Sequence, residues 1–219
     1  MTPPAPPFPE PPGWVRGAVA ALVVQDPTLG AIEAAAGPLP WRSRLPGFPG
    51  LLRAICGQQI SNAAAGAIWA RLAAIPGALE PASLLMLDDA TLCGTAGLSR
   101  PKAAHARSLA AACLNGTLRF DLLPDMADAE AVAHLSAVRG LGRWTAEVHL
   151  IFAAGRPDIF PVGDIALAAS VAHLQGRGSR PKPAELDIIA LAWRPWRSIA
   201  ARLFWHHWRH VTGRPIIEV

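Results

Sequence analysis

Two glycines in the second half of the chain have the type and spacing that phosphate binding requires. Residues 135–148 read LSAVRGLGRWTAEV: a short helical pattern, a Gly-x-Gly turn and a second helical pattern from Arg143. Gly140 and Gly142 can adopt left-handed backbone angles and lack a Cβ, so consecutive amides can point at an anion where the second helix begins. A lone Gly-x-Gly is more often only a structural turn, and these residues alone leave both interpretations open.

A single aspartate follows a proline- and glycine-containing stretch, FPVGD at residues 160–164. A carboxylate near an anomeric carbon can stabilise the positive charge that develops when an N-glycosidic bond breaks, and it can orient or deprotonate water. One carboxylate suffices when the leaving base is already cationic. The same pattern also fits an ordinary N-cap aspartate, whose helix-start amides favour the charged form.

The elements that position these residues are predicted to be helices. Alanine and leucine dominate from Trp14 onward, apolar residues recur three and four apart, and no stretch keeps a period of two. The predicted helices cover 14–24, 28–36, 48–57, 61–74, 83–86, 88–94, 99–115, 128–137, 143–154, 164–174, 184–192 and 195–212. Several residues are predicted to mark helix ends. Ser61, Ser83, Ser99 and Asp128 are expected as N-caps, Pro49 and Pro195 in first turns, and Gly116 just after the end of a helix.

Length and composition limit the class of protein. A chain of 219 residues fits one compact domain or two small lobes. Hydrophobic residues make up 52% and charged residues 16%, which excludes global disorder. No apolar stretch reaches the roughly 18–20 residues needed to span a bilayer, and residues 1–13 form a proline-rich tail rather than a leader. We therefore expect a cytoplasmic, nucleoid-associated protein with no membrane partner.

Cysteine and charge usage narrow the partners. The three cysteines are widely spaced without a CxxC pair, which argues against a disulfide framework, a zinc knuckle and an iron–sulfur cluster. Residues 131–219 carry 11 basic and 6 acidic groups, a net +5, and 18 of the 20 basic residues in the chain are arginine. Guanidinium groups suit a polyanion, although a coding bias towards arginine gives the same count.

The last part of the chain concentrates these cations. The stretch from Trp193 to Arg214 holds five arginines, no acid, and three histidines, His206, His207 and His210. Such a helix can supply contacts to a DNA backbone or be merely a solvated face. The histidines lack the third ligand that a zinc site needs.

The wider pattern resembles a known family. Leu135, Val138, Gly140, Leu141, Gly142, Thr145 and Ala146 resemble the helix-hairpin-helix motif, whose amides bind DNA phosphates without reading sequence. A hairpin followed by a glycine- or proline-rich stretch and one aspartate is similar to the helix-hairpin-helix DNA glycosylase superfamily, and within it to the DNA-3-methyladenine glycosylase II family. Residues 55–61, 96–103 and 193–198 support this resemblance, which covers about residues 26–213.

The resemblance implies an all-α fold of two lobes with the active site in the cleft between them. One lobe is expected from residues 14–42 plus 157–219 and the other from residues 43–156, which carry the hairpin. Residues 1–13 are expected to be disordered.

The resemblance also implies roles for individual residues. Asp164 becomes the catalytic carboxylate, and Trp144 and Trp205 line the pocket for the extruded base, where an indole face attracts a cationic base. Gln59 is expected to be the wedge, the side chain that fills the space vacated in the duplex, and Ser61 is the second candidate. Gln58 is expected to contact DNA beside them. Alternatively, both glutamines form hydrogen bonds with the backbone of the turn.

The remaining residues expected to contact DNA are Arg139, Gly140, Gly142, Arg143 and Thr145. No cofactor is required, but main-chain carbonyls of about Ser136, Val138 and Leu141 would hold a monovalent cation, Na⁺ or K⁺.

The sequence differs from the family pattern in three ways that bear on the expected activity. Arg139 stands where proline usually precedes the first glycine, which loosens the turn and adds a charge beside a phosphate. Trp144 occupies the position of the nucleophilic lysine of bifunctional relatives, so a Schiff-base lyase step loses its nucleophile. No cysteine follows Cys113, so the cluster found in other relatives is not expected.

The leading hypothesis is therefore a monomeric, monofunctional DNA glycosylase of base excision repair that acts on double-stranded DNA. It would flip out alkylated purines such as 3-methyladenine and 7-methylguanine and leave an abasic site. Two alternatives stay open: a non-catalytic helix-hairpin-helix DNA-binding module in which Asp164 is only a cap, and a glycosylase for an uncharged lesion such as uracil or hypoxanthine.

Overall fold

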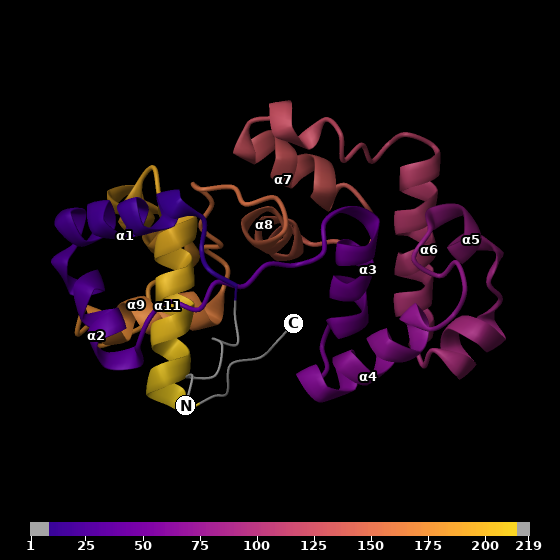
Figure 1. The fold of residues 1–219 in the computed structure, drawn as a ribbon, viewed down its shortest axis with the longest axis horizontal. Coiled ribbons are helices and arrows are strands. Elements are labelled where there is room, and N and C mark those ends of the chain that lie inside the picture. The colour runs from indigo at the N-terminus through magenta and orange to yellow at the C-terminus, as the bar shows by residue number, and fades with distance from the viewer. Residues whose placement is uncertain (1–8, 214–219) are drawn as a thin grey trace, which may run out of the picture. The chain divides into compact units, whose positions relative to one another are not determined.

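A computed structural model describes residues 9–213 and shows an all-helical protein, with no strand in that part of the chain (Figure 1). Residues 1–8, most of the expected tail, lie outside the described residues. The helices in chain order are α1 (Gly13–Gln25), the short η1 (Pro27–Leu29), α2 (Gly30–Ala36), α3 (Gly47–Gly57), α4 (Asn62–Ala73), α5 (Pro81–Met86), the π-helical η2 (Ala90–Thr95), α6 (Arg100–Leu114), the short η3 (Leu123–Asp125), α7 (Asp128–Ser136), α8 (Arg143–Phe152), α9 (Ile165–Leu174), α10 (Pro183–Ala190), the short η4 (Leu191–Trp193) and α11 (Arg197–Thr212).

Helix ends follow the predicted chemistry at several positions. Ser61 is the N-cap of α4, and its side chain accepts a hydrogen bond from the Ala64 N–H at 3.3 Å. Gly116 follows the end of α6 with a positive φ of 78°, the conformation that favours glycine after a helix.

Other predicted ends were wrong. Ser83 lies inside α5, which begins two residues earlier at Pro81, a suitable first-turn residue. Asp128 is the first residue of α7 rather than its cap, and the Glu130 carboxylate accepts a hydrogen bond from the N–H of the capping Ala127 at 3.0 Å. Pro195 precedes α11, because Trp196 takes the N-cap position.

The chain divides into two compact units. Within the described residues, unit 1 runs to Ser43 and resumes at Gly155, and unit 2 spans Arg44–Ala154. The boundaries expected from the sequence fall after residue 42 and after residue 156. Each unit is described separately below.

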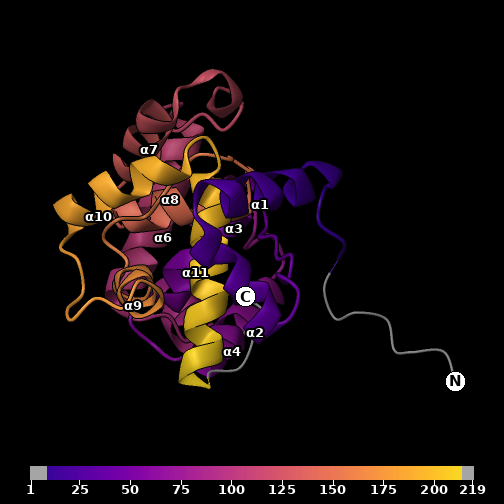
Figure 2. The ribbon, with the colours of Figure 1, turned by 90° about the vertical axis from the view of Figure 1, so that its left-hand side faces the viewer.

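Unit 1 is built around α11, which packs against α1, α2 and α9 (Figures 1 and 2). Its core holds the fully buried rings of Trp193 and Phe204, whose centroids lie 4.7 Å apart. The Trp193 indole N–H donates to the Asp26 carboxylate at 3.0 Å, so its polar edge is satisfied. Trp193 is thus a core residue of unit 1.

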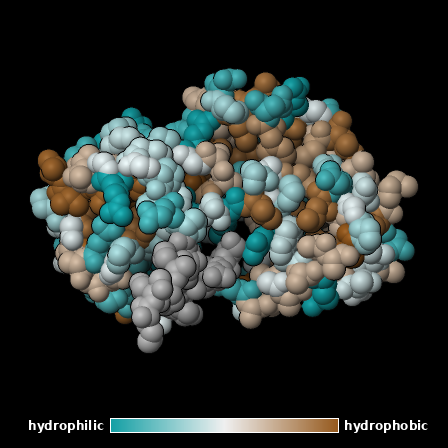
Figure 3. Space-filling model, in the orientation of Figure 1, coloured by the Kyte–Doolittle hydropathy of each residue, from teal (hydrophilic) through white to brown (hydrophobic). Residues whose placement is uncertain are grey.

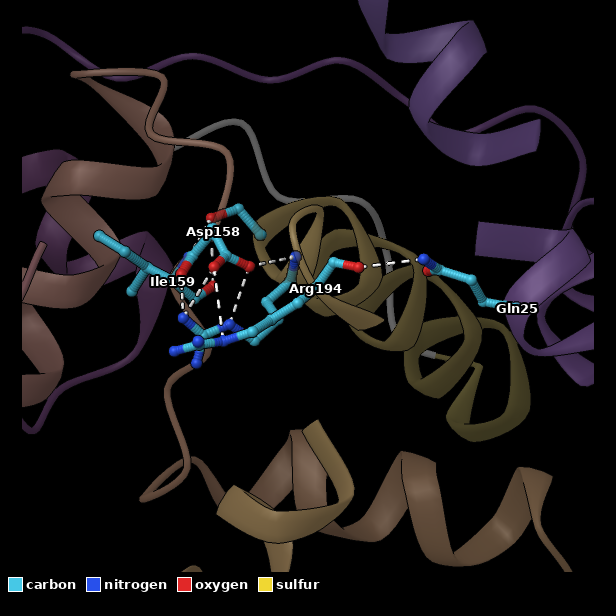
Figure 4. A network of polar contacts seen from close by, with 6 residues as sticks. Gln25, Asp158, Ile159 and Arg194 are labelled. Carbon is cyan, nitrogen blue, oxygen red and sulfur yellow. Dashed lines mark hydrogen bonds and ion pairs between the residues drawn. The ribbon is translucent and has the colours of Figure 1, made fainter. Parts of the chain in front are cut away.

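A polar network ties the segment before Asp164 to the start of α11 (Figure 4). Asp158 accepts a hydrogen bond from the Arg197 Nε at 2.8 Å and forms an ion pair with Arg194 at 3.7 Å. The Ser198 hydroxyl accepts from the Ile159 N–H at 2.9 Å and donates to the Ile159 carbonyl at 3.1 Å. Residues 158–159 are therefore fixed five to six positions before the candidate catalytic carboxylate.

The basic residues of α11 are largely engaged inside unit 1. Arg202 is buried, its guanidinium lies 4.0 Å from the centroid of the Trp41 ring, and it donates to the Arg42 carbonyl at 2.7 Å. His206, also buried, contacts the Gly37 carbonyl at 3.0 Å through Nε2. These contacts stabilise unit 1 by packing, so the count of cations in this helix overstates the charge available to a DNA backbone.

In unit 2, α6 is the helix on which the other elements are assembled. It packs against α3 and α5, while α3 also contacts α4 and α8, and α7 packs along α8. The buried residues of α6 that form this platform are Lys102, Ala103, Ala106, Leu109, Ala110 and Ala112. Small alanine side chains allow neighbouring helices to approach α6 closely.

Among residues 9–213, no helix combines the length and the apolar character that crossing a membrane requires.

Candidate active site and DNA-binding elements

Asp164 begins α9 as its N-cap, the position expected from the sequence. Its Oδ1 accepts hydrogen bonds from the Ala166 N–H at 2.8 Å and the Leu167 N–H at 2.9 Å. These two donors fix the orientation of the carboxylate at the N-terminus of the helix. The side chain is only partly buried, so a fixed anion lies within reach of a ligand.

Trp205 lies in the same unit, on α11. It is half-buried and packs against the apolar core of unit 1. Next to it, the Phe204 carbonyl accepts a hydrogen bond from the Ser170 hydroxyl of α9 at 2.7 Å, which fastens α11 to the helix that Asp164 caps. A role of Trp205 in base binding stays a prediction.

The predicted hairpin is present in unit 2, where α7 ends at Ser136 and α8 begins at Arg143. Within the turn, the Leu141 N–H donates to the Val138 carbonyl at 3.0 Å. Gly140 has φ of 96°, and a Cβ built there would lie 2.3 Å from the His105 ring, so both the turn and its close approach to α6 require glycine.

Gly142 differs from the prediction, because its φ of −81° and ψ of 165° place it in the extended region that any residue can adopt. A Cβ at this position would meet no atom within 4 Å. Neither the backbone angles nor close neighbours therefore require glycine at this N-cap of α8, although glycine is a favoured N-cap residue. A ligand held against the helix N-terminus would be a further reason for glycine here.

The second helix of the hairpin begins with exposed side chains. Arg139 is exposed, Trp144 has 47% of its surface exposed, and Arg143 is exposed while its Nε donates to the buried Glu147 at 2.8 Å. Thr145 is buried, so its side chain is less available to DNA than the prediction assumes. Figure 3 shows hydrophobic residues scattered in small groups on one face, which is ordinary for a protein surface. The exposed Trp144 directly follows Arg143, the first residue of α8.

The loop of residues 57–61, here called the wedge loop, connects α3 to α4. Among the described residues Gln59 is the only one other than glycine with a positive φ, 56°, and it is exposed. The Gln58 amide donates to the Gly140 carbonyl at 2.8 Å, which joins the wedge loop to the hairpin. Of the two glutamines, Gln58 therefore donates to a backbone carbonyl, whereas Gln59 is exposed to solvent.

Sequence reasoning assigned no role to two residues of α6 that support these elements. Lys102 is buried and donates from Nζ to the Cys56 carbonyl at 2.8 Å, and His105 lies under Gly140. Burial lowers the pKa of Lys102 and raises the pKa of the Cys56 thiol to about 11, so this thiol is neutral at physiological pH. No local sequence signal could show either contact, since both depend on how α6 packs.

The described residues contain no group of three or more His, Cys, Asp and Glu side chains that could hold a metal ion. His206 and His210, which have the spacing of paired zinc ligands, therefore gain no third ligand of these types there.

Comparisons with known proteins identify relatives of this chain. The chain is 29% identical over 163 residues to the alkylbase DNA glycosidase-like protein mag2 of Schizosaccharomyces pombe, covering 72% of this chain and 76% of that protein. It is 30% identical to DNA-3-methyladenine glycosylase 2 of Escherichia coli, covering 74% of this chain and 60% of the relative. The latter relative thus extends well beyond the matched region.

Solved structures are similar over nearly the whole chain. A DNA-3-methyladenine glycosidase from Bacillus halodurans has a TM-score of 0.80 and 29% identity, with 90% of this chain and 91% of that chain covered. The S. pombe 3-methyladenine DNA glycosylase in complex with abasic DNA has a TM-score of 0.76 and 25% identity, with 88% and 95% covered. The family model described as HhH-GPD superfamily base excision DNA repair protein matches residues 52–198, and the chain, matched over more than half its length, belongs to this superfamily.

Proposed function

We propose that this protein is a monofunctional DNA glycosylase that hydrolyses the N-glycosidic bond of alkylated purines, chiefly N3-methyladenine and also N7-methylguanine, in duplex DNA. The single observation that carries the proposal is Asp164, a carboxylate fixed at the start of α9 in a chain of the base excision repair superfamily. The relatives named as 3-methyladenine glycosylases support the substrate class.

The proposed reaction needs one anion and one water molecule. As the bond between the sugar C1′ and the purine nitrogen breaks, its electron pair leaves with the base and neutralises the charge that alkylation placed there. Asp164 stabilises the oxocarbenium-like sugar that forms, and water adds to C1′ and loses a proton to the carboxylate or to solvent. The products are the free base and an intact strand with an abasic site.

The exposed indole of Trp144 supports selection of a cationic base. Stacking of a positively charged purine on an indole gains about 1–2 kcal/mol through cation–π attraction that an uncharged lesion lacks. We infer that Trp144 contributes this selection, with Trp205 as the second aromatic candidate. Trp144 lies in the first turn of α8 and is about half exposed to solvent.

The hairpin supplies the sequence-independent contacts in this proposal. Amides at the start of α8 bind a phosphate, with Arg139 and Arg143 beside it. A monovalent cation fits the donor type of the turn, because main-chain carbonyls of Ser136, Val138 and Leu141 are oxygen ligands at the negative end of α7. The Val138 carbonyl keeps one lone pair after accepting from Leu141. Such an ion would add positive charge near the bound phosphate.

Base release from defined oligonucleotides tests the proposed function. We expect the protein to release N3-methyladenine and N7-methylguanine from methylated duplex DNA at least about fivefold faster than uracil or hypoxanthine from matched duplexes, as a cation–π preference of this size implies. Chromatography of the released bases measures this. DNA binding without release of any base would support the non-catalytic module, and preferred release of uracil or hypoxanthine would support the uncharged-lesion alternative.

The missing lysine nucleophile leads to a second expected result. Trp144 cannot form an imine, and Lys102 is engaged inside unit 2. Borohydride added during turnover should therefore trap no covalent enzyme–DNA species, and the abasic strand should stay uncleaved until it is treated with alkali. A bifunctional glycosylase run in parallel controls the trapping chemistry. A trapped adduct on a denaturing gel would overturn the monofunctional assignment.

A further inference from the structure

Gln59 holds a backbone conformation that the surrounding residues must enforce. A left-handed φ costs a non-glycine residue on the order of 1 kcal/mol, and it persists only where neighbouring contacts determine it. The wedge loop has such contacts at both ends: Ser61 caps α4, and the Gln58 amide is bonded to the Gly140 carbonyl. The end of α3, immediately before the loop, needs a restraint of its own.

Lys102 provides that restraint. The last carbonyls of a helix lack intrahelical partners, and the Cys56 carbonyl, one residue before the end of α3, accepts the Lys102 ammonium at 2.8 Å. A cation at this end also complements the helix dipole. Because the Cys56 thiol is neutral, the partner of the ammonium is this backbone oxygen rather than a thiolate.

A buried lysine is an expensive way to join two helices. Burying an ammonium costs more than a hydrogen bond to one carbonyl returns, and an apolar side chain of similar volume would pack α3 on α6 at lower cost. The contact therefore suggests a requirement for a defined position of the α3 terminus. The residues that this position controls directly are Gly57, Gln58 and Gln59.

We propose that Lys102 is a positioning residue for base extrusion: by holding the Cys56 carbonyl it fixes the end of α3, so that Gln59 enters the gap left by the extruded base. The same helix supports the hairpin turn through His105 beneath Gly140, so α6 sets the wedge loop and the phosphate-binding turn in register. This inference rests on the proposed function and adds a residue that touches neither the base nor the sugar.

The effect of Lys102 should depend on the presence of a paired strand. A wedge is needed only where extrusion leaves an orphan base, so a displaced wedge slows excision from duplex DNA and leaves excision from a single strand nearly unchanged. A residue that acts only through stability would lower both activities in the same proportion, because it reduces the amount of active protein.

The test compares single-turnover excision of N3-methyladenine from duplex and single-stranded DNA of one sequence. We expect Lys102→Met to lower the duplex rate at least about tenfold and the single-strand rate less than about threefold, and Lys102→Arg, which keeps a cationic donor, to recover most of the duplex rate. Arg107→Met is the matched control, because Arg107 is also on α6 and donates to a backbone carbonyl, that of Leu87, at 2.9 Å. Its two rates should fall together or not at all.

A double-mutant cycle separates this role from others. If Lys102 acts through Gln59, then Gln59→Ala combined with Lys102→Met should be no slower on duplex DNA than the slower single variant. Additive losses, or equal losses on the two substrates, would overturn the proposal. Should Lys102→Met fail to fold, Lys102→Gln, polar but too short for the same contact, carries the same comparison. A parent protein that releases base from neither substrate would instead refute the proposed function.

Discussion

Replacement of Asp164 by asparagine should abolish base release while damaged DNA is still bound. The carboxylate acts on a charge that appears only as the glycosidic bond breaks, so its loss affects the transition state more than the bound state. Removing a fixed electrostatic stabiliser costs about 10²–10³-fold in rate, and we expect at least a hundredfold loss here. Single-turnover excision and equilibrium binding on the same methylated duplex measure the two effects.

The local structure makes asparagine a well-matched substitution. Asparagine caps helices about as well as aspartate, and its carbonyl oxygen can accept the same hydrogen bonds from Ala166 and Leu167. A loss of activity would therefore report the missing charge rather than a frayed α9. Asp88→Asn is the matched control, because Asp88 also accepts a backbone hydrogen bond, from Thr91 at 2.8 Å, and it should keep full activity. Residual excision by Asp164→Asn within tenfold of the parent would remove Asp164 from the catalytic role.

The two interpretations of Asp164 that the sequence leaves open are not exclusive. The structure makes this residue a capping aspartate, and the cap is what holds its charge at one place. A flexible carboxylate would lose conformational entropy each time it approached a sugar, whereas one already bonded to two amides does not. The structural role therefore supports the catalytic one.

The local sequence pattern was sufficient to predict the positions of most helices. It was insufficient for helix ends that depend on contacts with other segments. The prediction for residues 99–115 differs from α6 by one residue at each end, since Pro101 and Gly116 mark its limits in the sequence itself. The prediction that α11 starts at residue 195 was wrong, because Trp196 occupies the N-cap. Whether such a residue starts a helix depends on contacts with segments distant in sequence.

The contacts that hold the candidate site in place could not be predicted from the sequence. Lys102 contacts a carbonyl 46 positions away, and Gln58 contacts one 82 positions away. Neither pairing has a periodic signal, because each arises only after α3, α6 and the hairpin have packed. The site residues themselves were predicted through resemblance to a family, which suggests roles but not the contacts that hold the side chains.

The glycines of the hairpin illustrate the same difference. The sequence gives Gly140 and Gly142 one common explanation, a left-handed turn beneath a phosphate. In the structure Gly140 has the positive φ and lies against His105, while Gly142 has neither constraint. Substitution of Gly140 would disturb the fold, so it cannot report on DNA binding. Substitution of Gly142 is free of this problem and can therefore report on DNA binding.

Gly142→Val should weaken binding to damaged and undamaged duplex alike, by about tenfold. Valine adopts the extended angles of this residue readily, and its Cβ meets no protein atom, so the cost to stability is on the order of 1 kcal/mol for a poorer N-cap. The added methyl groups would keep a phosphate away from the amides at the start of α8. Loss of one charge-assisted hydrogen bond, about 1.5–3 kcal/mol, accounts for an effect of this size.

Titration of both duplexes at several salt concentrations measures the effect. Each neutralised phosphate contributes about 0.9 to the slope of log K against log salt, so the variant should show a shallower slope than the parent by about one phosphate. Gly178→Val is the matched control, because Gly178 is also exposed and open around its Cβ but lies far along the chain from the hairpin. If a folded Gly142→Val protein bound undamaged DNA with the affinity and salt slope of the parent, the hairpin would be an ordinary turn. The exposed arginines outside it would then have to account for the contacts to the DNA backbone.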